Sequence, residues 1–236
     1  MSLLALEHVT KRYASGQRET LALRDASLAL RAGECVAVHG LRRSGRTTLL
    51  RVAAGILPPD AGVVRLEGQD LAERSRPALG VEIGYCSPLF DPAHGGTVAD
   101  HVAVGLLARG TRRTRARAQA EEALERAGAS GSAHLDPRDL RADELVRAGI
   151  ARALAPAPRV LLLDEPASGV ERPERDRLVA LLSALARGGM AVLMTVGEPL
   201  AGLDRTLTLD GGSLRAGAAP DPEGVVALPR HAEPVA

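Results

Sequence analysis

Apolar and polar residues alternate loosely at the start of the chain. Residues 3–13 (LLALEHVTKRY) and 22–30 (ALRDASLAL) place a nonpolar side chain at about every second position. A period of two residues is typical of β-strands that bury one face and expose the other. This region is therefore predicted to form antiparallel strands.

Further along, compact apolar runs alternate with segments of helical period. The apolar runs, which read as buried strands, are residues 35–39, 62–68, 83–86, 159–163 and 190–196. The helical segments, each ended by Pro or Gly, are residues 47–57, 146–155 and 174–189. Strand, crossover helix and strand recurring in this order predict an α/β fold with a mainly parallel core sheet.

The region from about residue 88 to 145 has a different character. Residues 97–110 and 115–128 have helical spacing and are rich in Ala, Leu, Glu and Arg. They predict a helical subdomain inserted into one α/β domain of residues 1–217. The last stretch, residues 218–236, is rich in Pro and Ala and is predicted to be a disordered tail.

Composition and charge narrow the choice of function. The hydrophobic fraction of 45% suits a globular core, and a net charge of +1 gives no case for a nucleic-acid partner. The basic stretch 111–119 is followed by three glutamates on the same predicted helix, which favours a solvated face over a nucleic-acid patch. No apolar stretch is long enough for a bilayer, and the start lacks the layout of a signal peptide. Cys35 and Cys86 lie in apolar runs, so we expect two buried free thiols in a reducing cytoplasm.

Residues 40–48 (GLRRSGRTT) have the spacing of a phosphate-binding loop. Gly, four residues, a second Gly, a basic residue and Thr follow an apolar run and precede a predicted helix. Backbone N–H groups at a helix start point at a bound anion, and the helix dipole favours negative charge there. The predicted phosphate contacts are Gly40, Leu41, Arg42, Arg43, Ser44, Gly45, Arg46, Thr47 and Thr48. The alternative is an ordinary surface turn rich in Gly and Arg.

The basic residue of this loop is Arg46, where the fingerprint has Lys. Lys11 is the only lysine in the chain, so a general drift from Lys to Arg explains the change without any loss of function. The Arg46 guanidinium is expected to reach the β- and γ-phosphates, and the Thr47 hydroxyl a magnesium ion. A guanidinium differs in shape from an ammonium group, so we expect binding to survive better than catalysis.

Two acids follow the buried run 159–163, at the end of a strand, where parallel α/β sheets place their binding sites. Asp164 is predicted to hold Mg²⁺, directly or through water, and Glu165 to orient and deprotonate an attacking water. A lone Asp-Glu pair after a strand is often only the acidic first turn of a helix. The phosphate loop upstream favours the nucleotide site.

These motifs resemble the nucleotide-binding subunit of ATP-binding cassette (ABC) transporters, from about Leu3 to Gly217. Residues 148–171 are similar, without a gap, to the run from the family's signature helix to its D-loop, and residues 203–214 resemble its closing strands. The resemblance implies a P-loop ATPase fold of the ABC type that binds ATP and Mg²⁺, with Tyr13 beneath the adenine. The alternative for Tyr13 is a half-buried strand residue.

Several positions depart from the family's pattern. Residues 140–144 (LRADE) stand where the signature Leu-Ser-Gly-Gly-Gln is expected, and Asp143 and Glu144 bring negative charge toward a partner's γ-phosphate. Arg141 offsets part of that charge. A proline cannot supply the amide of the glutamine loop, and a valine cannot make the hydrogen bond of the switch histidine. The degenerate positions are Pro88, Arg141, Ala142, Asp143, Glu144 and Val196.

The resemblance predicts an ATP-binding subunit of an ABC transporter, docked on separate transmembrane subunits at the cytoplasmic, inner face of the cell membrane. A second ABC ATPase subunit is the other expected partner, and the departures predict weak or partner-dependent hydrolysis. One alternative is a non-catalytic pseudo-ATPase that regulates or scaffolds an assembly. Another is a cassette protein of DNA repair or translation, although those usually have long insertions or tandem cassettes, which this sequence lacks.

Overall fold

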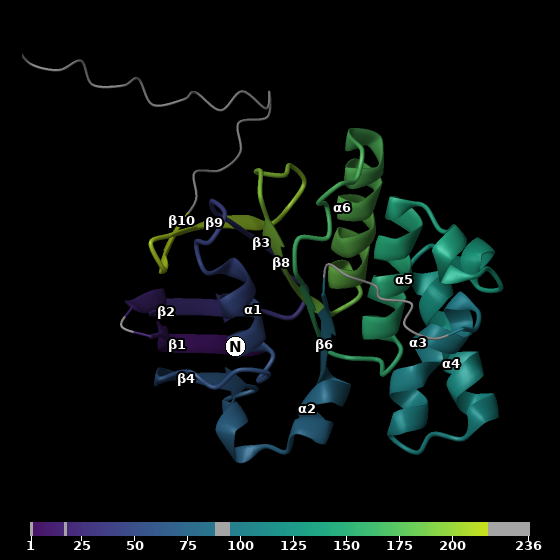
Figure 1. Cartoon of the computed structure of the whole chain (residues 1–236), viewed down its shortest axis with the longest axis horizontal. Helices are drawn as coiled ribbons and strands as arrows, with labels where there is room; N and C mark the ends of the chain where they lie inside the picture. The colour runs from purple at the N-terminus through teal and green to yellow at the C-terminus, as the bar shows by residue number, and fades with distance from the viewer. Residues whose placement is uncertain (1, 17, 88–94, 217–236) are drawn as a thin grey trace, which may run out of the picture.

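Two sheets and a group of helices lie in adjoining layers in the computed structural model, which describes residues 2–16, 18–87 and 95–216. In Figure 1 the small sheet lies at the lower left, the larger sheet crosses the centre, and the helices α3 to α6 lie on the right.

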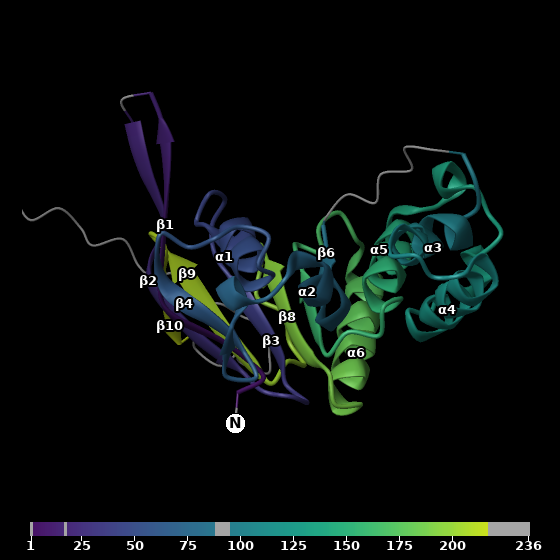
Figure 2. The ribbon, with the colours of Figure 1, turned by 90° about the horizontal axis from the view of Figure 1, so that it is seen from below.

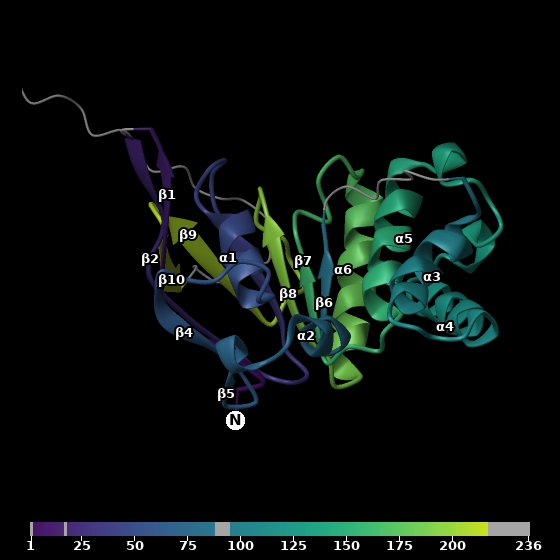
Figure 3. The ribbon, with the colours of Figure 1, turned by 60° about the horizontal axis from the view of Figure 1, so that its bottom comes forward.

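The small sheet is antiparallel, with strand order β2-β1-β4-β5. Its strands are β1 (Leu4–Ser15), β2 (Arg18–Leu30), β4 (Ala61–Leu66) and β5 (Gln69–Asp70). β1 pairs with β2 on one side and with β4 on the other. The far end of β1 and β2 projects from the body as a hairpin (Figures 2 and 3). The predicted antiparallel strands at the start of the chain are confirmed.

The larger sheet is mainly parallel, with strand order β10-β9-β3-β8-β7-β6. Its strands are β3 (Cys35–His39), β6 (Ile83–Cys86), β7 (Val160–Leu163), β8 (Ala191–Val196), β9 (Arg205–Asp210) and β10 (Ser213–Ala216). β3 runs parallel to both of its neighbours, β8 and β9, and β10 is antiparallel to β9. The carboxyl ends of β3, β7 and β8 therefore meet at one edge of this sheet, which confirms the predicted α/β fold class.

Helices cover both faces of the larger sheet. On one face, α1 (Arg46–Ala53) shares an apolar core with β3 and the small sheet. On the other face, α5 (Ala142–Leu154) and α6 (Arg172–Arg187) pack against the same sheet. The central strands β3, β7 and β8 are buried on both faces, which is why they read as continuous apolar runs rather than as alternating ones.

The predicted helical subdomain is formed by α3 (Val98–Ala108) and α4 (Arg113–Arg126), which pack against α5. The buried contacts are largely alanines, whose small side chains let helices approach closely; they include Ala99, Ala103, Ala116, Ala120, Ala123 and Ala148. The remaining short helices of the described residues are α2 (Arg76–Glu82) and the 3₁₀ turns η1 (Leu71–Glu73), η2 (Ser130–Ser132) and η3 (Pro137–Asp139).

Two helix boundaries differ from the sequence-based prediction by more than two residues. The helix predicted over residues 47–57 ends at Ala53, because Gly55 takes a left-handed conformation with φ of 67° and turns the chain away. The helix predicted over residues 146–155 begins earlier, at Ala142, because the Glu144 carboxylate accepts a hydrogen bond from the Arg141 backbone N–H and so satisfies the start of the helix.

Pro88 and the predicted tail of residues 218–236 lie outside the described residues. None of the helices in the described ranges combines the length and the apolar character that a membrane span needs. Cys35 and Cys86 are buried free thiols, as predicted. Burial raises the pKa of both thiols to about 12.

Candidate functional site

The loop after β3 ends in a helix start that is open to an anion. Gly45 is the residue before the first residue of α1. Among the described residues, no side chain caps the backbone N–H groups at the start of α1, and no acidic residue lies in its first turn. Gly45 has a φ of 104°, and a Cβ there would lie 2.1 Å from the Ala22 carbonyl oxygen. Only glycine fits this backbone, so the loop geometry depends on it. The free N–H groups form the kind of site that binds phosphate.

Ser44 adds a polar atom without a partner. Its Oγ is buried and has no hydrogen-bond partner among the described residues. An unsatisfied buried hydroxyl costs about 1–3 kcal/mol, so this position favours a ligand or a water that completes its bonding. Gly40 leaves the space for this hydroxyl, because a Cβ on Gly40 would lie 2.6 Å from Ser44 Oγ. The orphan hydroxyl and the open helix start together fit a phosphate group.

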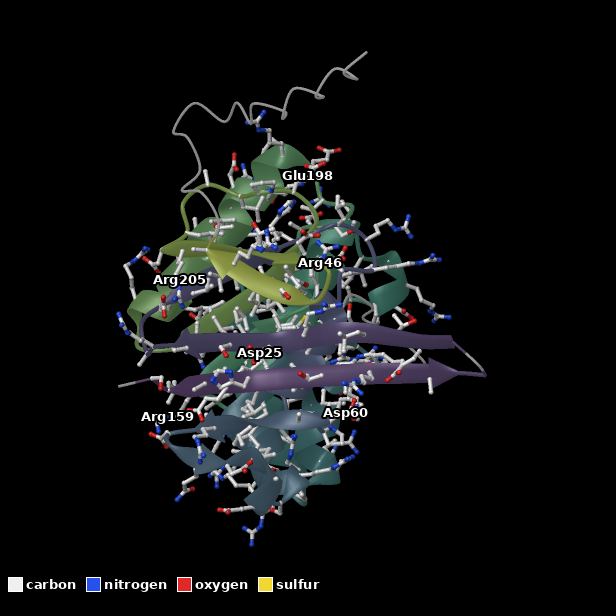
Figure 4. The ribbon with its side chains drawn as sticks, turned by 90° about the vertical axis from the view of Figure 1, so that its left-hand side faces the viewer. Asp25, Arg46, Asp60, Arg159, Glu198 and Arg205 are labelled. Atoms are coloured by element: carbon white, nitrogen blue, oxygen red, sulfur yellow. The ribbon has the colours of Figure 1, made fainter. Side chains whose placement is uncertain are left out.

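Arg46, the first residue of α1, points across the edge of the sheet. Its side chain is 6% exposed, and its Nη2 donates to Oε1 of Glu165 at 2.8 Å. Its Nη1 donates to the backbone carbonyl of Val196, at the end of β8. In Figure 4, Arg46 and Glu198 both lie above the long strands β1 and β2. The structure therefore joins the predicted loop cation, the predicted base and the switch-histidine position in one cluster.

The two acids after β7 have different surroundings. Asp164 is 3% exposed, and its Oδ1 accepts from Thr195 Oγ1 at 2.7 Å. Its Oδ2 accepts from the Tyr85 hydroxyl at 3.5 Å, and burial, followed by the charge of Asp164, raises the pKa of Tyr85. The Glu165 backbone N–H donates to Thr195 Oγ1 at 2.9 Å, and Glu165 has a φ of 49°, an uncommon value for a residue with a side chain. Neighbouring strands thus hold both acids in place.

Thr195, Tyr85 and the Val196 carbonyl are site groups that the sequence reasoning missed. The available signal for Thr195 was a hydroxyl at the end of an otherwise apolar run beside the predicted acids. For Tyr85 the signal was one of the chain's two tyrosines at the end of another buried strand. No sequence signal identifies a backbone carbonyl.

Magnesium fits this edge of the sheet only together with a phosphate. Among the described residues there is no group of three or more His, Cys, Asp or Glu side chains that could hold a metal. Asp164 and the half-buried Thr47 are the predicted ligands. Mg²⁺ is commonly held by one or two protein oxygens and completed by substrate phosphates and water, so this sparse set suits a nucleotide-bound ion.

Tyr13 lies on β1 beside the start of α1. Its side chain is 41% exposed, and its hydroxyl lies 3.3 Å from Thr48 Oγ1. The exposed ring and the loop are therefore near each other, as a base-stacking residue requires. Leu41 is 78% exposed, and Arg42 and Arg43 are exposed as well, so the tip of the loop faces solvent.

The residues at the signature position lie apart from this cluster. They begin α5, which in Figures 1 and 3 stands on the far side of β6 from α1. Arg141 Nη2 lies 3.1 Å from Asp143 Oδ2, and Arg141 Nε lies 3.7 Å from Glu144 Oε2. The other Glu144 oxygen, Oε1, accepts from Ser132 Oγ at 3.4 Å. Acids of the chain itself thus occupy the start of this helix, where Ala142 is the first helical residue.

The comparison with known proteins agrees with this geometry. Residues 23–168 match the family model described as ABC transporter. The chain is 35% identical over 219 residues to the lipoprotein-releasing system ATP-binding protein LolD of Chromohalobacter salexigens, covering 90% of this chain and 92% of that protein. It is 38% identical over 217 residues to the Fe(3+) ions import ATP-binding protein FbpC of Streptomyces coelicolor, covering 90% of this chain and 61% of that protein. It is 41% identical over 180 residues to the methionine import ATP-binding protein MetN of Myxococcus xanthus, covering 75% of this chain and 54% of that protein.

Solved structures show the same fold. The dimeric structure of a bacterial ABC transporter cassette matches with a TM-score of 0.77 at 24% identity, covering 89% of this chain and 96% of that one. The ADP conformation of another ATP-binding cassette matches with a TM-score of 0.79 at 21% identity, covering 92% of this chain and 90% of that one. The chain belongs to the ABC transporter family, as an ATP-binding subunit.

Proposed function

We propose that this chain binds Mg-ATP at the loop between β3 and α1 and couples it to separate transmembrane subunits, with weak or partner-dependent hydrolysis. One observation carries the proposal: an uncapped helix start with an orphan Ser44 hydroxyl stands at the sheet edge that holds Asp164 and Glu165. Phosphate groups satisfy the free N–H groups and the hydroxyl together.

The residues take distinct parts in this proposal. The loop from Gly40 to Thr48 cradles the phosphates, and the Tyr13 ring stacks on the adenine. Asp164 and Thr47 hold the magnesium ion, which neutralises phosphate charge when bound. Glu165 orients the attacking water and accepts its proton.

Weak turnover follows from the surroundings of Glu165. Its carboxylate is paired with Arg46, and this ion pair has to open before the carboxylate can accept a proton from water. The side chain of Val196 has no donor for a γ-phosphate, and its backbone carbonyl only accepts a hydrogen bond, from Arg46. These features favour binding over hydrolysis.

The relatives indicate the kind of assembly but not its cargo. Those named above serve lipoprotein release, Fe(3+) import and methionine import, and a further relative is a macrolide export ATP-binding/permease protein. The last one, 29% identical over 219 residues, is covered by this chain over only 34% of its length. We place this chain at the inner face of the membrane, held there by membrane subunits that contact its helical subdomain.

Nucleotide titration tests the proposal. Isothermal titration of the purified chain with Mg-ATP is expected to show saturable binding, while phosphate release stays at or near background. If neither the chain alone nor the assembly recovered with it from native membranes binds ATP, the proposed function is wrong. Rapid magnesium-dependent turnover by the isolated chain, abolished in Glu165→Gln, would contradict weak hydrolysis.

A second candidate is a pseudo-ATPase that binds nucleotide without turnover and regulates its assembly. The end of β8 favours it, because Val196 has no side-chain donor for a γ-phosphate. The recovered assembly separates the two candidates. ATP consumption that stops when Glu165 of this chain is replaced supports the transporter ATPase, whereas unchanged consumption supports the pseudo-ATPase.

A further inference from the structure

The Arg46 guanidinium connects three segments that are far apart in the sequence. It starts from the first turn of α1 and contacts both the acid after β7 and the last residue of β8. Each of its two terminal nitrogens donates to a different one of these segments. A lysine at this position has a single terminal nitrogen and a shorter reach, so it does not reproduce this two-armed contact.

The backbone of Glu165 is fixed independently of Arg46. Its backbone N–H is bound by Thr195 Oγ1, which in turn donates to the buried Asp164 carboxylate. Arg46 is attached to the phosphate loop itself and carries a long flexible side chain. The arginine is therefore the member of the pair that lies next to an anion entering the loop and can exchange the carboxylate for it.

The side chain of Glu165 borders open space. It is 34% exposed, whereas that of Arg46 is 6% exposed. A cleft of about 170 Å³ lies beside it, lined by Ser168, Arg175, Gly197 and Glu198 among others. Glu165 can therefore remain solvated after losing its cation, which keeps the opening of the pair accessible.

We propose that Arg46 and Glu165 form a latch, in which a triphosphate binds only by drawing the guanidinium away from the acid. The affinity for nucleotide is then set by competition between the phosphates and the Glu165 carboxylate for one cation. This inference rests on the proposed function, because it assumes that the loop binds ATP. It assigns to Arg46 and Glu165 a control over binding in addition to their parts in phosphate contact and hydrolysis.

A double-mutant cycle on binding tests the latch. The dissociation constant of a non-hydrolysable ATP analogue is measured, with Mg²⁺, for the unmodified chain, Arg46→Lys, Glu165→Gln and the double variant. Removing the acid is expected to tighten binding about tenfold more when Arg46 is present than in the Arg46→Lys background. General charge repulsion from Glu165 acts in both backgrounds and cancels in this ratio.

Glu198→Gln is the matched control. Glu198 lines the same cleft, its side chain is 79% exposed, and it pairs with Arg175 rather than with Arg46. Its replacement removes a nearby charge without touching the latch, so the change in affinity is expected to be the same in both backgrounds.

Glu165→Asp distinguishes the effect of the contact with Arg46 from the effect of the negative charge. It can be measured even if the Arg46 variants do not fold. It keeps the negative charge but withdraws the carboxylate from the guanidinium. The latch predicts several-fold tighter binding, whereas charge repulsion alone predicts no tightening. Binding that is measurable but shows less than twofold coupling, or no response to Glu165→Asp, overturns the latch while leaving the proposed function standing. Absence of binding in every variant overturns the proposed function and the latch with it.

Discussion

At the scale of single residues, replacing Ser44 is expected to act differently on the stability of the chain and on its affinity for ATP. Ser44→Ala removes a buried polar atom that has no partner among the described residues, so the free energy of unfolding is expected to stay unchanged or to rise by up to about 1 kcal/mol. The affinity for ATP is expected to fall about tenfold to a hundredfold, because a hydrogen bond to a charged group contributes about 1.5–3 kcal/mol. Urea unfolding and calorimetric titration measure the two effects.

Ser168→Ala serves as its control, since this exposed serine lies on the neighbouring cleft rather than in the loop. It is expected to change neither quantity. A Ser44→Ala variant that is less stable yet binds ATP normally would show that the hydroxyl is structural instead.

Gly45 is the residue on which the shape of the loop depends. Gly45→Ala is expected to lower the free energy of unfolding by more than about 2 kcal/mol, because the new Cβ would lie 2.1 Å from the Ala22 carbonyl oxygen. Gly189 has a similar φ of 100° but nothing within 4 Å of such a Cβ, so Gly189→Ala is expected to cost only about 1–2 kcal/mol. Chemical unfolding compares the two variants. If both lose the same free energy of unfolding, the positive φ alone, and not the contact with Ala22, explains the effect.

At the scale of elements, the start of α5 depends on Glu144. Glu144→Ala is expected to lower the free energy of unfolding by about 1 kcal/mol, because the Arg141 N–H loses its acceptor and the helix start loses a favourable charge. Glu144→Gln keeps an acceptor and is expected to lose less. Glu122→Ala, at an exposed position on α4, is the control and is expected to stay within about 0.5 kcal/mol of the unmodified chain in urea unfolding.

The elements also show how far the sequence could predict this molecule. The parallel strands, the antiparallel pair and the helical insert follow from apolar periodicity, and the loop and the acids follow from motif spacing. The end of α1 was missed because Gly55 acts through its backbone conformation, which an apolar pattern extending to Leu57 conceals. The contact of Arg46 with Glu165 and the Val196 carbonyl depends on which strands are neighbours of β3. Local sequence carries no record of that order.

At the scale of the whole molecule, the acids at the start of α5 affect which second ATP-binding subunit this chain can pair with. When this chain pairs with a second ATP-binding subunit, as its family membership leads us to expect, the start of α5 is expected to face the partner's nucleotide. In a pair of identical copies, Asp143 and Glu144 of each would face the other's triphosphate. Two like charges about 4 Å apart repel by about 4 kcal/mol at an effective dielectric constant of 20, which Arg141 offsets only in part. We therefore expect an identical pair to be disfavoured relative to a pair with a partner that has a different signature.

Mass measurement in solution tests this preference. With saturating Mg²⁺ and a non-hydrolysable ATP analogue, the unmodified chain is expected to remain monomeric in light scattering. Asp143→Gly combined with Glu144→Gln removes both charges and moves the helix start toward the family signature, so nucleotide is expected to increase the dimer fraction. Glu121→Gln combined with Glu122→Gln changes the net charge equally on α4 and is expected to leave the chain monomeric. If the unmodified chain dimerises on adding nucleotide, the charges at the start of α5 do not decide its choice of partner.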